Sequence, residues 1–265
     1  MKYYCVTIKP FQNEFVHTTY KTYSLRFFLS LIVFMLGSLC SVSAQSGAIV
    51  STDKDSTQDI QFRFQPQINS EPLKLGRSYY ISGLEDSVSI EKLKFYIAEL
   101  TLYNAEMTHV HISPATFLID MEDSASLQRS CAIPKGVSYQ KLSFSLGLDS
   151  AIQCSGAKGG ELDPTRGMYW SWQSGYINLK LEGTSNSCPA RNHLIQYHIG
   201  GFQSPYNTRQ SLVFEYDHSP SILITMDLNK LLTEKNITEN FQIMSPNQKA
   251  MDFAKNLPDL FRIGP

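Results

Sequence analysis

The sequence predicts an all-β fold, a single β-sandwich-like antiparallel domain with long loops and a short C-terminal helix. Short stretches in which apolar and polar residues alternate recur along the chain, and this is the period of a strand with one buried face. Turn-forming glycine, proline and serine residues separate these stretches. Aromatic residues make up 12% of the chain and charged residues only 18%, which also favours a β-rich protein.

The bulk composition narrows the class of protein. The chain has 265 residues, of which 42% are hydrophobic, and this is enough for a sizeable core. Its formal net charge of -1 argues against a protein that binds nucleic acid or a membrane surface through a basic face.

Residues 1–44 predict an N-terminal region that ends in a secretory signal peptide. Lys21 and Arg26 precede the apolar run 27–39, and small residues at 42–44 offer a cleavage site. The apolar run is too short for a stable membrane span. We therefore expect a periplasmic or secreted protein.

The mature chain is expected to begin with a flexible linker over residues 45–59, followed by the β domain over residues 60–265. In the first half of this domain the alternation predicts strands at 60–64, 79–81, 89–103, 116–119 and 138–148. The third of these is long enough for a helix, but its apolar set changes parity near Ala98 and Glu99. A strand with a β-bulge at that point explains the change.

The second half of the domain predicts further strands at 176–182, 193–201, 212–216 and 221–227, then a helical turn at 227–232 and a helix at 247–256. In the first of these strands Ile177, Leu179 and Leu181 share one side, so we expect one buried and one solvated face. An exported chain permits a disulfide. Cys154 and Cys188 could join the ends of this region, but other pairings, including ones with Cys131, are equally allowed.

Few residues suggest chemistry. The sequence contains no nucleophile-and-base motif, zinc-protease motif or phosphate-binding loop, so we do not expect an enzyme. His109 and His111 would lie on the same side of an extended segment, and form either a partial metal site or two solvated loop histidines. His198, on a predicted strand, is either a half-exposed strand residue or a ligand.

The most distinctive stretch runs from Gly167 to Gly183 and holds both tryptophans, Trp170 and Trp172, in the pattern W-x-W. Together with Gly147-Leu148-Asp149, Leu162-Asp163-Pro164, Leu93 to Ile97 and Tyr197-His198-Ile199-Gly200, it resembles the MbnP-like family. The resemblance spans roughly Ile60 to Phe261. Members of this family are exported copper-binding proteins encoded beside a di-haem, peroxidase-like cytochrome, as one half of a metallo-mystery pair.

The resemblance implies copper as the cofactor and an MbnH/MauG-like di-haem cytochrome as the partner. It also implies that the partner oxidises a tryptophan, Trp170 or Trp172, to kynurenine, which then helps to bind copper together with histidine. Imidazole nitrogen suits copper, so His198 is the leading candidate ligand, with His109 and His111 as further candidates.

The geometry of this site depends on how the strands pair. In a simple hairpin His198 would lie near Tyr176, with Trp172 about 13 Å away. A kink at Gly175, or covering loops, would then be needed to bring a tryptophan to the histidine. The alternative function is a β-sandwich module without metal that binds a protein or a cell-surface glycan through its aromatic patch.

Overall fold

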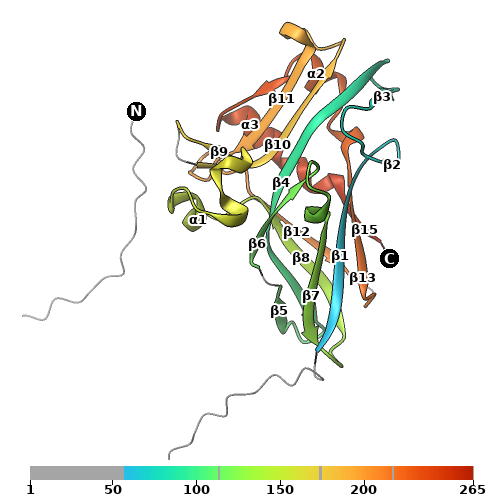
Figure 1. Cartoon of the computed structure of the whole chain (residues 1–265), viewed down its shortest axis with the longest axis vertical. Helices are drawn as coiled ribbons and strands as arrows, with labels where there is room; N and C mark the ends of the chain where they lie inside the picture. The colour runs from blue at the N-terminus through green and yellow to red at the C-terminus, as the bar shows by residue number, and fades with distance from the viewer. Residues whose placement is uncertain (1–56, 113, 173–174, 217, 265) are drawn as a thin grey trace, which may run out of the picture. The chain divides into compact units, whose positions relative to one another are not determined.

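The computed structural model describes residues 57–112, 114–172, 175–216 and 218–264. The predicted signal peptide and residues 45–56 of the predicted linker lie outside this part of the chain. The described residues form two β-sheets that pack against each other, as the sequence predicts (Figure 1). The first strand begins at Thr57, so residues 57–59 belong to the β domain rather than to the linker.

The smaller sheet has the strand order β15-β13-β1-β2, with β7 also paired to β1. Its strands are β1 (Thr57–Ile68), β2 (Glu71–Pro72), β7 (Gln128–Pro134), β13 (Ser221–Asp227) and β15 (Phe261–Gly264). The predicted antiparallel arrangement has an exception here, because β1 and β13 run parallel. These strands are far apart in the sequence, so no tight hairpin constrains their relative direction.

The larger sheet has the order β12-β8-β4-β10-β11-β14. Its main strands are β4 (Asp86–Asn104), β8 (Tyr139–Leu146), β10 (Gly175–Ser185), β11 (Leu194–Gly200), β12 (Gln210–Glu215) and β14 (Gln242–Ile243). Four shorter strands pair along them: β3 (Ser78–Ile81), β5 (His109–His111), β6 (Thr116–Asp120) and β9 (Tyr169–Trp170). The pair β11–β14 is also parallel.

The central strand β4 contains the predicted bulge. The register between β4 and β8 shifts between Ala98 and Thr101, and Glu99 has a left-handed φ of 55°. The parity change in the sequence therefore marks a real bulge, and the stretch is a strand rather than a helix.

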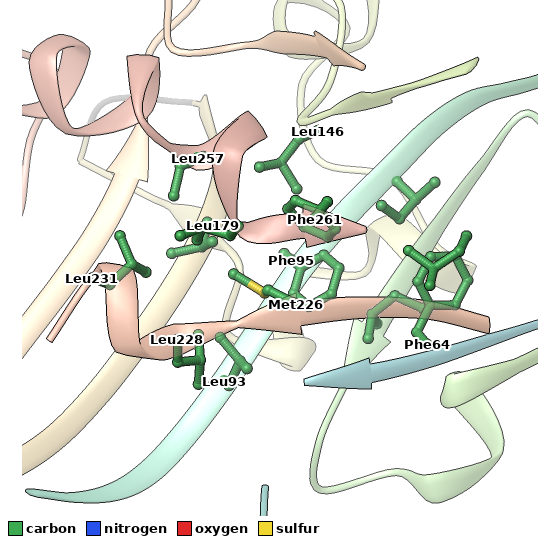
Figure 2. Packing of buried hydrophobic residues seen from close by; sticks show 14 of the residues in the cluster. Phe64, Leu93, Phe95, Leu146, Leu179, Met226, Leu228, Leu231, Leu257 and Phe261 are labelled. Atoms are coloured by element: carbon green, nitrogen blue, oxygen red, sulfur yellow. The ribbon is translucent and has the colours of Figure 1, made fainter. Parts of the chain in front are cut away.

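The main core lies between the two sheets. Figure 2 shows Phe95 of β4 beside Met226 of β13 and Phe261 of β15. The rings of Phe95 and Phe261 meet edge to face with centroids 5.9 Å apart. Leu179 and Leu181 of β10 belong to the same cluster, as predicted. Ile177, expected on the same side, belongs to a second cluster instead, because the register of β10 shifts between Ile177 and Leu179.

The helices are short. The expected C-terminal helix is α3 (Gln248–Lys255), and the Asn247 side chain caps it by accepting from the Ala250 amide. The expected helical turn is a 3₁₀ turn (Leu228–Lys230). The sequence patterns did not predict two further helices, α1 (Ser150–Cys154) and α2 (Glu234–Thr238). None of the helices in the described chain is long and apolar enough to cross a membrane.

The remaining 3₁₀ turns are Ser124–Leu127, Gly160–Leu162, Pro164–Arg166, Arg191–His193 and Leu257–Leu260. Cys188 is a buried free thiol that donates to the Leu194 carbonyl at 3.4 Å. It is therefore not bonded to Cys154, which removes one of the disulfide pairings that the sequence allows.

The second face of the larger sheet is covered as well, contrary to the predicted solvated face of β10. Tyr176 is 1% exposed and Asn178 is 2% exposed. They lie under the segment 148–172, which contributes to a second hydrophobic cluster that we call the outer cluster. Its members are Tyr96, Leu118, Leu148, Met168, Trp170, Tyr176 and Ile177. This cluster positions the tryptophan motif.

Candidate functional site

The two tryptophans lie where the chain reverses direction. β9 pairs antiparallel with the start of β10, so that Trp170 lies opposite Gly175 and Tyr169 opposite Tyr176. The change of face expected at Gly175 is thus a full reversal of the chain just before that residue. Gln173 and Ser174 lie outside the described residues.

Trp170 is the inner tryptophan. It is 6% exposed and belongs to the outer cluster. Its ring lies directly on Gly200 of β11, where an added Cβ would come within 2.7 Å of a Trp170 ring carbon. A side chain at position 200 would therefore displace the indole, which explains why the glycine is needed there.

Trp172 is the outer tryptophan. It is 65% exposed, although its ring centroid lies only 5.8 Å from that of Trp170, with the planes at 46°. The pair therefore forms a continuous aromatic contact from the surface to the buried side of β9. A protein that approaches this surface reaches Trp172 first.

His198 lies on the same face as this pair, but in a different register from the predicted one. It pairs with Lys180 rather than lying near Tyr176, because the β10–β11 hairpin pairs Thr184 with Leu194 and runs in register from there to His198. His198 and Gly200 are two residues apart on one strand and therefore point the same way. The indole over Gly200 thus lies roughly 7 Å along the strand from His198. The chain reversal before Gly175 takes the place of the kink that was expected to bring a tryptophan towards the histidine.

The imidazole of His198 is buried and paired. Its Nε2 atom lies 2.7 Å from Oε1 of Glu182, and the side chain is 8% exposed. Two ammonium groups flank the same carboxylate, Lys180 at 3.5 Å and Lys92 at 3.4 Å. The Lys180 ammonium also donates to the Gly167 carbonyl at 3.1 Å, which ties the tryptophan segment to the sheet.

Burial is the main influence on the charge of the His198 imidazole. It lowers the pKa of His198, and the hydrogen bond to Glu182 opposes this shift without cancelling it. Burial alone would raise the pKa of Glu182, but the His198 hydrogen bond and the Lys180 and Lys92 ammoniums hold that pKa below its ordinary value. A neutral His198 donates Nε2–H to the carboxylate and keeps its lone pair on Nδ1.

His109 and His111 form β5 instead of a loop, and they lie on the same side as the extended geometry predicts. Their ring centroids are 4.7 Å apart. They are nevertheless remote from His198. β5 pairs with Thr101 to Tyr103 of β4, whereas His198 pairs with Lys180, which in turn pairs with Lys94 of β4. Thr101 lies about 23 Å along the strand from Lys94.

The three candidate metal ligands therefore do not share one site. Figure 1 shows the same separation, with β5 near the lower end of the domain and β9 on its upper part. Within the described residues, no group of three histidine, cysteine or carboxylate side chains is placed to hold a metal ion.

Sequence patterns missed the residues around His198. Glu182 and Lys180 looked like the solvated side of a strand, and Gly200 like an ordinary strand end. Sequence parity could have identified these residues, because Lys180 and Glu182 share their side of the strand with Tyr176 and hence with the tryptophans.

Comparisons with known proteins identify the family and the fold that this chain resembles. A family model described as MbnP matches residues 57–251. Among solved structures, MbnP from Methylosinus trichosporium superposes with a TM-score of 0.53 and 19% sequence identity, over 66% of this chain and 77% of that chain. At this identity the structural likeness concerns the fold alone. A search of curated proteins found no match.

Proposed function

The chain belongs to the MbnP family, and from that premise we propose that it is an exported copper-binding protein whose W-x-W motif is oxidised by a di-haem, MbnH-like cytochrome. In this proposal the chain is the recipient of the oxidation and not an enzyme. The observation that carries it is the pair of tryptophans that runs from the surface at Trp172 to the buried Trp170 beside the strand of His198.

The two tryptophans have different parts in this proposal. Trp172 is exposed and serves as the contact for the partner. Trp170 is the residue converted to kynurenine, because its ring lies over Gly200 on the face that carries His198. New ligand atoms at Trp170 would therefore arise near an imidazole, whereas those of Trp172 would face solvent.

Conversion of Trp170 to kynurenine opens the five-membered ring of the indole. The C2–C3 bond of the indole breaks as two peroxide molecules are reduced to two waters, and one oxygen atom enters at each of these carbons. The oxygen at C3 becomes a ketone. Hydrolysis then releases C2 as formate and leaves an aryl amine. The partner supplies the oxidising power, and the chain supplies the position of the ring.

Around His198 the unmodified residues do not make a copper site by themselves. His198 is engaged by Glu182, two ammonium groups lie nearby, and the described chain offers no third histidine, cysteine or carboxylate suitably placed. Copper binding in this proposal is therefore conditional on the modification. The kynurenine at position 170 and the Nδ1 atom of His198 would be its ligands, and imidazole and amine nitrogen suit copper.

The test compares the chain isolated from its own host with the chain made in a host that lacks the di-haem partner. Peptide mass spectrometry is expected to find Trp170 with one carbon lost and one oxygen gained only in the first preparation, which alone retains copper at this site. His198→Ala should retain the modification but lose the copper. Trp170→Phe should lose both, and His218→Ala is the matched histidine control.

A second function is supported by the exposure of the aromatic patch. Trp172 and Tyr206 are 65% and 38% exposed, and stacking on such rings is a common way to bind a glycan or a partner protein. His198 paired to a carboxylate is also what a module without metal would contain. Intact tryptophans and no retained copper in the native preparation would favour this function.

Export is part of the same proposal. The predicted cleavage site places Gln45 at the start of the mature chain. N-terminal sequencing of the native protein, combined with cell fractionation, tests this directly. A chain that retains residues 1–44 in the cytoplasmic fraction would contradict export.

A further inference from the structure

The histidines of β5 form a second group with chemical potential that the proposed function does not use. His109 and His111 flank Val110 on an extended strand, and both are exposed. Their rings meet with centroids 4.7 Å apart and planes at 67°. Tyr103 of the neighbouring strand lies beside them, with its ring centroid 5.6 Å from that of His109.

Hydrogen bonding fixes the orientation and tautomer of His111. The Thr101 hydroxyl donates its single hydrogen to the Glu99 carbonyl at 2.7 Å. The same oxygen lies 2.9 Å from Nδ1 of His111, so here it acts as the acceptor and Nδ1 carries the hydrogen. A neutral His111 therefore keeps the lone pair on Nε2. A hydrogen bond of this kind to the second ring nitrogen is typical of histidines that bind metals.

The bulge in β4 makes this contact available. Glu99 has a φ of 55°, and the register of β4 shifts between Ala98 and Thr101. The local turn brings the Glu99 carbonyl to the Thr101 hydroxyl, which leaves that hydroxyl able to accept from His111. Bulges often re-aim side chains next to functional sites in this way.

The separation of the rings fits a shared metal ion. A metal bound at about 2.0 Å from an imidazole nitrogen lies roughly 3.2 Å from that ring's centroid. Two centroids 4.7 Å apart then subtend an angle of about 95° at the metal, close to the angle between neighbouring ligands in tetragonal Cu(II). Among divalent first-row ions, Cu(II) also binds nitrogen ligands most tightly.

The surroundings leave room for the other coordination positions. His111 borders a groove of about 880 Å³, which Tyr103, Met107 and Val213 also line. Met107 is 57% exposed, so its thioether is accessible at the rim. Water or a small ligand in this groove can complete the coordination of an ion held by the two imidazoles.

We propose that His109 and His111 form a separate copper site that takes Cu(II) without any oxidation of tryptophan. His111 contributes Nε2, and Thr101 is a positioning residue that holds the ring. This inference does not rest on the proposed function, because the site lies on a different strand from His198 and needs no haem partner.

The test uses the untagged mature chain made in a host without the di-haem partner, so that both tryptophans are intact. Titration with copper(II) sulfate, followed by calorimetry and electron paramagnetic resonance, is expected to find one Cu(II) per chain with coupling to two imidazole nitrogens. His109→Ala and His111→Ala should each abolish this signal. His198→Ala and the exposed control His218→Ala should leave it unchanged.

Thr101→Val tests the positioning role. The His111 ring loses its fixed partner, so the affinity for Cu(II) should fall about tenfold with an unchanged circular dichroism spectrum. Absence of Cu(II) binding, survival of the signal in the His109→Ala/His111→Ala double variant, or its loss in His198→Ala would each overturn the proposal. None of these outcomes bears on oxidation of Trp170 in the native host, so the two proposals fail separately.

Discussion

The two histidine regions of the larger sheet differ in what surrounds the imidazole. His198 is buried, lies two residues from the glycine that Trp170 covers, and is paired with Glu182. His109 and His111 are exposed on a three-residue strand, and the hydrogen-bond partner of His111 is the hydroxyl of Thr101. A carboxylate partner with flanking ammonium groups makes His198 part of a closed network. A hydroxyl partner orients His111 and leaves a nitrogen lone pair accessible.

This difference separates two routes to a metal site. In the proposed function, further ligand atoms near His198 arise from oxidation of Trp170, whereas the two imidazoles of β5 are present without any modification. Stability should follow the same division, because the covered region is part of a hydrophobic cluster and the exposed pair is not.

The largest expected effect comes from the inner tryptophan. Trp170→Ala removes a buried indole from the outer cluster, so the free energy of unfolding should fall by about 3–5 kcal/mol. The His109→Ala/His111→Ala double variant should change it by less than about 0.5 kcal/mol. Urea denaturation measures both. Equal small changes would mean that the tryptophan segment does not pack on the sheet as described.

A smaller effect is expected from the glycine beneath that ring. In Gly200→Ala the new methyl group would lie 2.7 Å from a Trp170 ring carbon, and such overpacking should cost about 1–3 kcal/mol. Gly159→Ala is the matched control, because nothing lies within 4 Å of its added Cβ. The indole fluorescence should shift only in Gly200→Ala, and an unshifted spectrum with unchanged stability would argue against the contact.

Low pH should reduce the stability that His198 and Glu182 contribute to the folded chain. The folded pKa of His198 is below its ordinary value of 6.5. Just below pH 6.5 the unfolded chain therefore binds more protons than the folded chain, and the free energy of unfolding decreases as the pH is lowered. Glu182 adds to this at lower pH. Its contribution is complete above its ordinary pKa of 4.5 and is lost as pH falls through the lower folded value.

The measurement is the free energy of unfolding against pH for the wild type and for His198→Gln. The wild type should lose more stability than the variant as pH falls below 6.5. The groups that face this imidazole are the Glu182 carboxylate and the Lys180 and Lys92 ammoniums. Parallel curves would show that His198 titrates alike in the folded and unfolded chains.

The smallest effect on stability is expected from the outer tryptophan. Trp172 is 65% exposed, so Trp172→Ala should change the free energy of unfolding by less than about 0.5 kcal/mol. The yield of kynurenine at Trp170 in the native host should nevertheless fall, because the contact for the partner is lost. A normal yield would remove Trp172 from the proposed mechanism.

Local patterns in the sequence predicted much of the fold. The parity change in β4 placed the bulge at Ala98 and Glu99, and the spacing of His109 and His111 placed both rings on one side. These features depend only on the period of an extended chain, which residues a few positions apart determine.

Long-range packing could not be read in the same way. The alternation of β10 predicted a solvated face, but the segment 148–172 returns over that face and buries Tyr176 and Asn178. The register of His198 depends on where the β10–β11 hairpin closes, with Thr184 opposite Leu194, and the parallel pairing of β1 with β13 joins strands far apart in the chain. No local period encodes any of these contacts.

We claim that Trp170 of the tryptophan pair is oxidised and then holds copper together with His198. Peptide mass spectrometry of the protein from its own host, with copper measured on the same sample, decides this. The expected result is kynurenine at Trp170, an intact Trp172 and copper that His198→Ala removes. Two intact tryptophans and no copper dependent on His198 would contradict the claim.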